Sequence, residues 1–186
     1  MQEQLTSSPP VNSLESELEQ EQSPPAPKLI LPPKEEFKLY RGWRIIQHAG
    51  HGIIRKRPYV TVNGRPLTYF GPWKRNPEGE TVFEWGYYGA GPGTLAESIL
   101  ADFFGENYPE RGYANNIDYN ARLYGSLFKE DFIGKLPRPE VGDEVDDSWE
   151  ISSDQIRRWF YSLEEEGITK EALLKGIYGE EYYKSK

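Results

Sequence analysis

The sequence predicts an α+β domain: a small antiparallel sheet of about three or four strands, with about four helices packed on one face. Two observations predict this class. Stretches rich in β-branched and aromatic residues, separated by glycine turns, come first, between residues 37 and 88. Stretches with apolar residues at helical spacing come later, from residue 94 onward. With 186 residues, the chain is long enough for one domain with a substantial core.

The first 36 residues differ in composition from everything that follows. They are rich in Glu, Gln, Ser and Pro, and carry seven acidic and two basic residues. Such a segment cannot bury enough apolar surface to offset the entropy of ordering it. We therefore expect a disordered acidic tail over residues 1–36, followed by a single domain over residues 37–186. The one apolar cluster in the tail, Leu29–Leu31, could dock on the domain or on a partner.

Strands are predicted in the first part of the domain. Four apolar residues of FKLYRGWRII are candidates for one face of a strand: Phe37, Leu39, Trp43 and Ile45. Asn63-Gly64 suits a type I′ turn between strands over Tyr59–Val62 and Arg65–Tyr69. The basic, glycine-bearing HAGHGIIRKR predicts a mobile loop, and Thr81–Tyr88 predicts a further strand.

Helices are predicted in the second part, over residues 94–104 and 119–135. A third helix begins at the cap signal Ser152–Asp154, and Thr169 caps a short last helix. The chain has no cysteine, which excludes disulfides and zinc–thiolate sites, and we expect neither a metal nor a cofactor. No signal peptide or membrane-spanning run is evident, so we expect a cytoplasmic protein.

Charge is distributed unevenly along the chain. Residues 37–76 hold nine basic, no acidic and seven interleaved aromatic residues, whereas residues 77–186 hold 23 acidic and 11 basic residues. The basic block could bind nucleic acid through phosphate contacts and base stacking, or could pair with the protein's own acidic helices. Because the net charge is -8, a bounded anionic ligand, such as a nucleotide or a short nucleic acid, fits better than a long duplex.

The stretch FEWGYYGAGPGTLAESIL joins an aromatic run to a helix through a glycine turn. Gly91-Pro92 would place glycine at the N-cap and leave the amides of Gly93–Leu95 free to hold an anion. Alternatively, Thr94-x-x-Glu97 fits a capping box, in which Glu97 would satisfy those amides and repel an anion. The turn matches neither the P-loop nor the dinucleotide-binding pattern. Ten residues are candidates for ligand binding: Arg41, Arg44, Arg65, Glu84, Trp85, Tyr87, Gly89, Gly91, Gly93 and Thr94.

Two further features concern possible chemistry. Glu84 could bind a sugar hydroxyl or a guanidinium group; the alternative, which we favour, is an ion pair with the basic block, for example with Arg41 or Arg65. His48 and His51 are the only histidines, and a third metal ligand is missing from HAGH. We interpret them as loop histidines and assign no catalytic residue.

The stretch FEWGYYGAGPGTLAESILADFFG resembles the signature of a small bacterial and bacteriophage family of unknown function. The resemblance extends to KLYRGWRI, VTVNGRPL, LYGSLFKEDFIGKLP and SWEISSDQIRRWF, and covers about residues 38–161. It implies no chemistry, but it implies an accessory or host-interaction role in phages and mobile elements. The family pattern often has serine before Gly-Pro; here Ala90 precedes Gly91-Pro92, which removes any side-chain contact from that position.

Three functions follow from these observations. The first, which we expect, is a non-enzymatic module that binds a nucleotide-like or other anionic ligand at the glycine turn and the basic sheet. The second is a protein–protein adaptor or inhibitor that acts on a host protein through its acidic helices and tail. The third is a nuclease or hydrolase that uses His48 or His51 with Glu84.

Overall fold

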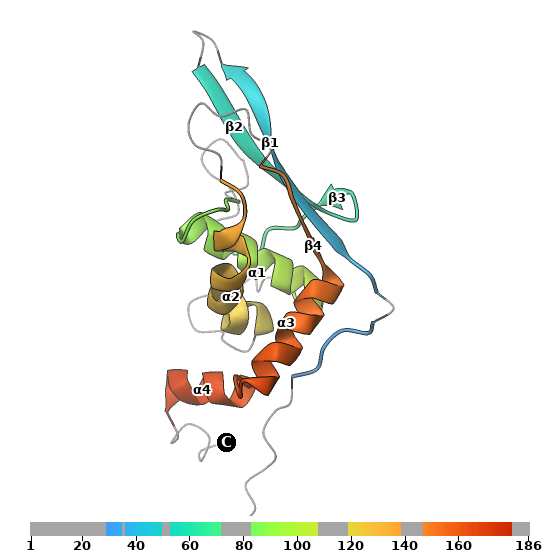
Figure 1. Ribbon diagram of the computed structural model, residues 1–186, viewed down its shortest axis with the longest axis vertical. Helices are drawn as coiled ribbons and strands as arrows, with labels where there is room; N and C mark the ends of the chain where they lie inside the picture. Colours follow the sequence, from blue (N-terminus) through green and yellow to red (C-terminus); the bar gives the residue numbers. More distant parts are fainter. Residues whose placement is uncertain are drawn as a thin grey trace, which may run out of the picture.

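The computed structural model describes residues 29–34, 36–49, 53–71, 83–107, 119–138 and 147–179. In these residues it has one four-stranded antiparallel sheet, in the order β3-β2-β1-β4, which confirms the predicted α+β class (Figure 1). The strands are β1 (Leu39–Ala49), β2 (Ile53–Val62), β3 (Arg65–Pro66) and β4 (Trp149–Ser152). The helices are α1 (Ala90–Phe104), α2 (Asn120–Asp131), the short 3₁₀ helix η3 (Ile133–Lys135), α3 (Ser153–Glu165) and α4 (Lys170–Tyr178).

Strands β1 and β2 form a long hairpin. Their pairing runs from Tyr40 opposite Val62 to Ala49 opposite Ile53, and the hairpin extends past the helices (Figure 1). The mobile loop predicted for HAGHGIIRKR is therefore wrong outside residues 50–52, which are not described. The β-branched pair Ile53 and Ile54 favours an extended backbone, and strand pairing supplies hydrogen bonds that a glycine-bearing loop would lack.

The predicted turn at Asn63-Gly64 is confirmed, since both residues have positive φ, 48° and 77°. The Asn63 side chain also stabilises the start of β1, because its Oδ1 accepts a hydrogen bond from the Leu39 amide at 2.8 Å. The strand that follows this turn is shorter than predicted and covers only Arg65–Pro66. Pro66 has no amide hydrogen to donate to a neighbouring strand.

The strand predicted over Thr81–Tyr88 is wrong where the chain is described. Residues 83–85 have no regular structure and residues 86–89 bend. The Gly86 amide donates instead to the Ile133 carbonyl, at 3.0 Å, so the aromatic run is held by a helix rather than by a strand. The fourth strand is β4, which pairs with the first four residues of β1.

The helices differ from the predictions mainly at their ends. Helix α1 begins at Ala90, with Gly89 as N-cap, so Pro92 stands at the third helical position, where its missing amide hydrogen costs nothing. The predicted helix over 119–135 is interrupted at Phe132 and continues as η3. Predicted caps are confirmed at both later helices: Ser152 and Gln155 form a capping box, and Thr169 accepts from the Ala172 amide.

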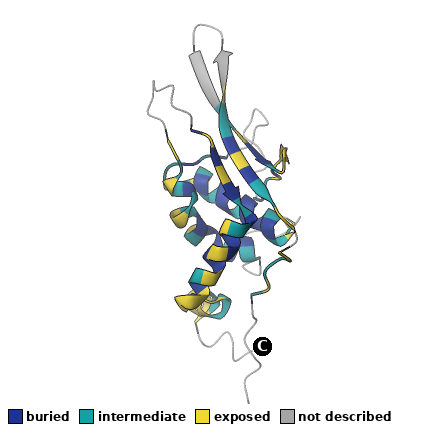
Figure 2. Cartoon of the chain, turned by 45° about the vertical axis from the view of Figure 1, so that its right-hand side comes forward, coloured by how far each residue is buried: buried dark blue, intermediate teal, exposed yellow. Residues whose placement is uncertain are grey.

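The two faces of the sheet have different surroundings. On one face, strand residues join the helices in the hydrophobic core: Tyr40, Val60, Trp149 and Ile151 pack with Leu95, Ile99, Phe103, Phe128 and Phe160. Buried and exposed residues alternate along the strands (Figure 2). On the other face, which we call the open face, Arg41, Ile45 and Tyr59 are exposed, whereas Thr61 is buried. Three of the four residues proposed to share a face, Leu39, Trp43 and Ile45, do so on the open face.

None of the helices in the described ranges is both long and apolar enough to cross a membrane. Before β1, Leu29 and Leu31 pack against the core, which is one of the two places expected for this cluster. The part of the expected tail that precedes them, residues 1–28, lies outside the described residues.

Candidate functional site

The glycine turn is tightly packed by its own neighbours. Gly86 has a φ of +79°, and a Cβ added there would stand 2.5 Å from the Arg138 Cβ. A Cβ on Gly89 would stand 2.5 Å from the Tyr87 ring, and a Cβ on Gly91 would stand 2.8 Å from the Glu84 Cβ. Real Cβ atoms do not come so close to other atoms, so close packing alone accounts for glycine at these three positions.

The amides expected to be free at this turn are used by the helix. The Gly93 amide donates to the Gly89 carbonyl at 3.1 Å, and Thr94 and Leu95 lie inside α1, where amides bond to the preceding turn. The N-cap at Gly91 is wrong, because Gly89 is the N-cap and no side chain caps the helix. The capping box at Thr94 is wrong for the same reason.

A buried ionic cluster lies next to the turn, on the helix side of the sheet. Arg44 of β1 pairs with Glu84 at 3.0 Å and with Asp147, and its side chain is only 10% exposed. Its guanidinium also lies over the Trp85 ring, 4.1 Å from the centroid. The prediction that Glu84 forms an ion pair with the basic block is therefore confirmed. Its partner, however, is Arg44 rather than Arg41 or Arg65.

Trp85 is a core residue. It is fully buried and meets Trp149 edge to face, with ring centroids 5.7 Å apart. The Trp149 ring in turn lies against Gly42, where a Cβ would be 2.3 Å away. Strand β1 thus needs glycine at position 42 to admit the indole of β4. In the part of the chain that the structure describes, neither indole N–H has a hydrogen-bond acceptor.

Tyr87 stands at the outer edge of this cluster. Partial burial raises the pKa of its hydroxyl above the usual value, the Glu84 carboxylate raises it further, and the Arg138 and Arg44 guanidiniums oppose both. Arg138 lies over the Tyr87 ring at 4.8 Å. Because Glu84 and Tyr87 both lie against Gly91, an anion approaching that part of the turn would meet a carboxylate.

The open face carries a different set of side chains. Trp43 and Tyr59 stand opposite each other in the β1–β2 register, with ring centroids 4.9 Å apart. Arg41 lies on one side of this pair, 54% exposed, and forms an ion pair with Glu150 at 2.6 Å. On the other side, Ile45 is 42% exposed and stands opposite Arg57. Two adjacent aromatic rings therefore lie beside the exposed Arg41, whereas Arg57 is only partly exposed and its Nε is buried.

The ten predicted site residues are divided among four places. Arg44, Glu84 and Trp85 form the buried cluster, with Tyr87, Gly89 and Gly91 beside it. Gly93 and Thr94 belong to α1. Arg41 lies on the open face, and Arg65 is exposed on β3 at the edge of the sheet.

Sequence reasoning missed the pairing of Trp43 with Tyr59. Both were among the interleaved aromatic residues, but only the strand register brings them together. It also missed Asp147 and Trp149, because no local pattern marks the short strand β4 after the acidic run DEVDD. His48 belongs to β1, and His51 lies outside the described residues. In the ranges that the structure describes, no three His, Cys, Asp or Glu side chains are grouped to hold a metal ion.

Residues 40–162 match the family of unknown function DUF6166, so the chain belongs to that family. The match begins in β1 and ends in α3, and thus includes the sheet, the glycine turn and the buried cluster. It leaves out Leu29–Pro33 and α4. Searches of curated proteins and of solved structures find no match.

Proposed function

We propose that the chain is a non-enzymatic binding module that holds a short single-stranded nucleic acid, or a nucleotide, on the open face of its sheet. The observation that carries the proposal is the Trp43–Tyr59 ring pair beside the exposed Arg41. Bases stack on aromatic rings whatever their sequence, and arginine pairs with the phosphates between them. Sheets with exposed aromatic residues on one face are an established platform for single strands.

The charge of the surroundings favours a short ligand. Glu150 lies beside Arg41 on the open face, and the whole chain has a net charge of -8, so a long polyanion would be repelled beyond the platform. Two rings provide stacking surface for about two bases, in line with one aromatic side chain per base. The glycine turn is not needed in this proposal, since its amides and its space are used by the protein itself.

The biological setting is part of the same proposal. The module is encoded by a bacteriophage or mobile element and acts in the cytoplasm of a bacterial host, where nucleotides and single-stranded nucleic acids are available as ligands. The resemblance of its signature to a bacterial and phage family supports this setting.

The test measures the fluorescence anisotropy of labelled octanucleotides of thymidine and of uridine with the full chain, at low and high salt. We expect binding that weakens with salt, and the oligonucleotide to be recovered intact. Tyr59→Ala should weaken binding about tenfold or more, because stacking contributes about 1–3 kcal/mol per base. Tyr161→Ala is the matched control, since Tyr161 is also exposed but lies on α3. No binding at low salt, or an equal loss in both variants, would overturn the proposal.

A protein adaptor is the second candidate, and the end of α3 favours it. Glu164, Glu165 and Glu166 are all exposed there, close to the exposed Tyr161. A basic surface of a host protein would complement these carboxylates. The test compares host proteins captured by the full chain and by a variant with all three residues changed to Gln. Capture of the same protein by both chains would exclude this acidic surface.

A further inference from the structure

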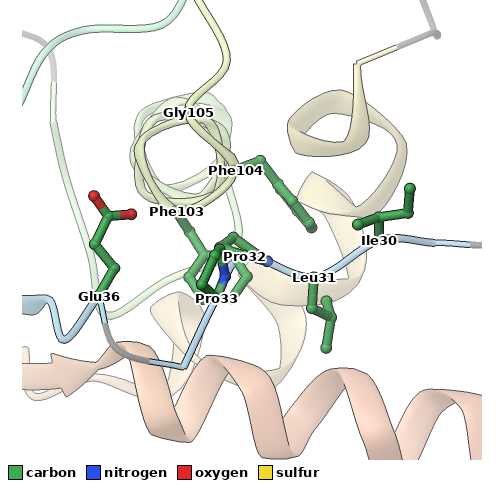
Figure 3. A pocket seen from close by; sticks show the side chains of 8 residues that line it. All are labelled: Ile30, Leu31, Pro32, Pro33, Glu36, Phe103, Phe104 and Gly105. Carbon is green, nitrogen blue, oxygen red and sulfur yellow. The ribbon is translucent and has the colours of Figure 1, made fainter.

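The segment Leu29–Pro33 lies across the end of α1 and the side of α3 (Figure 3). Leu29 and Leu31 pack against the core, whereas Ile30 between them is 84% exposed. The segment is therefore extended, with alternate side chains directed into the protein. Pro32 and Pro33 follow, beside Phe103, and Phe104 reaches toward Leu31 (Figure 3).

Arg157 of α3 holds the backbone of this segment. One of its terminal nitrogens donates to the Pro32 carbonyl at 2.5 Å, and the other donates to the Pro33 carbonyl at 3.2 Å. Arg157 is only 7% exposed, and within the described part of the chain it forms no ion pair. Two peptide carbonyls, with the Phe103 ring at 5.8 Å, thus stabilise a buried guanidinium that carboxylates usually stabilise.

The chemistry of the two sides is complementary. Proline has no amide hydrogen, so Pro32–Pro33 offers the groove only carbonyl acceptors. Arginine is a donor only, and its planar fork reaches two adjacent carbonyls at once. Prolines restrict the unbound peptide to extended conformations and pack on aromatic rings, which is how proline-rich peptides are bound by aromatic grooves.

The segment does not fill the groove. A cavity of about 280 Å³ remains between it and the end of α1, lined by Leu31, Pro32 and Pro33 on one side and by Phe103, Phe104 and Gly105 on the other. Among the described residues, the Arg157 Nε–H is buried and has no acceptor. The groove thus retains free volume while the segment is in place.

We propose that this groove is a recognition site for extended peptides of the pattern Leu-x-Leu-Pro-Pro, and that residues 29–33 are its resident ligand, displaced when a partner protein presents the same pattern. The site lies on α1 and α3, and it does not depend on nucleic-acid binding at the open face. Because the resident segment is covalently joined to β1, its effective concentration is high. A free peptide should therefore bind well only when the resident segment is weakened.

The experiment uses a fluorescein-labelled peptide with the sequence of residues 27–34 and the full-length chain. We expect Leu29→Ser with Leu31→Ser in the protein to release the resident segment, and this chain to bind the peptide at least tenfold more tightly than the wild type. Adding Arg157→Met should remove that gain. In the peptide, Ser in place of both leucines, or Ala in place of both prolines, should weaken binding, and changes in the peptide cannot unfold the protein.

A second measurement keeps the proposal testable if the double variant does not fold. In a chain with Leu29→Ser alone, which removes only one of the two anchoring side chains, the labelled peptide should still bind more tightly than to the wild type. The proposal is overturned if a folded double variant fails to bind the peptide, or if Arg157→Met leaves binding unchanged. It is equally overturned if the Leu29→Ser chain binds the peptide no more tightly than the wild type does.

Discussion

Two arginines of β1, Arg41 and Arg44, stand three residues apart and have opposite surroundings. Arg44 is buried between two carboxylates and the Trp85 ring, and it is part of the protein's interior. Arg41 is exposed on the open face and has one exposed partner, Glu150. Successive side chains of a strand point to opposite faces of the sheet. Arg44 therefore stabilises the protein's interior, whereas a ligand can reach Arg41.

The same division extends to the aromatic residues of the sheet. On the covered side, Trp85 and Trp149 meet in the core next to Gly42. On the open side, Trp43 and Tyr59 meet at the surface. Close packing therefore fixes the residues of the covered side, while the surface proposed to bind a ligand lies on the opposite face of the sheet.

The largest effect is expected for Arg44→Ala. This change leaves Asp147, itself buried, without its cation, and should lower the free energy of unfolding by about 3–5 kcal/mol. Urea unfolding measures it. Changing Arg44→Met together with Glu84→Gln and Asp147→Asn should recover much of the loss, since no unpaired charge then remains. A loss below about 1 kcal/mol would mean that Arg44 resembles a surface arginine.

The next effect concerns the glycine turn. Gly86→Ala combines a left-handed backbone with a clash against Arg138, and should cost roughly 2–4 kcal/mol of unfolding free energy. Gly64→Ala is the matched control, because Gly64 also has a positive φ but has open space around it; it should cost only about 1–2 kcal/mol. Equal losses would show that packing at the turn contributes nothing.

High pH should lower the free energy of unfolding, because Tyr124 is buried in the core. Burial, with the Glu164 carboxylate as a smaller cause, raises the pKa of Tyr124 to about 12, whereas an unfolded chain ionises at about 10. Above pH 10 the unfolded chain releases this proton and the folded chain keeps it. The free energy of unfolding therefore falls by up to about 1.4 kcal/mol per pH unit until pH 12.

Urea unfolding at a series of alkaline pH values checks this dependence. Tyr124→Phe should make the decline with pH shallower by one proton, while the other tyrosines continue to contribute. An identical slope in the two chains would contradict the assignment.

The smallest effect on stability is expected for Arg41→Ala. Exposed ion pairs contribute about 0–1 kcal/mol, so the free energy of unfolding should barely change. Oligonucleotide affinity, however, should fall, and its dependence on salt should become weaker, because one phosphate contact is lost. Glu150→Gln should do the reverse and tighten binding. If Arg41→Ala lowered stability as much as Arg44→Ala, the two faces would not differ as described.

Composition and periodicity were sufficient to predict the α+β class, the Asn63-Gly64 turn and the caps at Ser152 and Thr169, because these depend on local chemistry. The strand predicted at Thr81–Tyr88 was wrong for a nonlocal reason: its Gly86 amide is used by η3. The short β4 was missed because its four residues become a strand only by pairing with β1.

The candidate site shows the same limit. The ion pair of Glu84 could be predicted from the uneven charge, but the choice of Arg44 depends on which side of the strand faces the helices. The start of α1 was misplaced because Gly91-Pro92 is a good start signal, whereas the helix already begins at Ala90, with the Gly93 amide bonded to the Gly89 carbonyl. The Trp43–Tyr59 platform depends on strand register, which no local pattern supplies.

The position of Leu29–Pro33 has one more consequence. This segment reaches the domain at the end where α3 and α4 lie, whereas the β1–β2 hairpin extends from the other end (Figure 1). A peptide bound by Arg157 and a strand bound along the hairpin would therefore not obstruct each other. One copy of the chain could then bind a peptide and a nucleic acid at the same time and keep them a fixed distance apart.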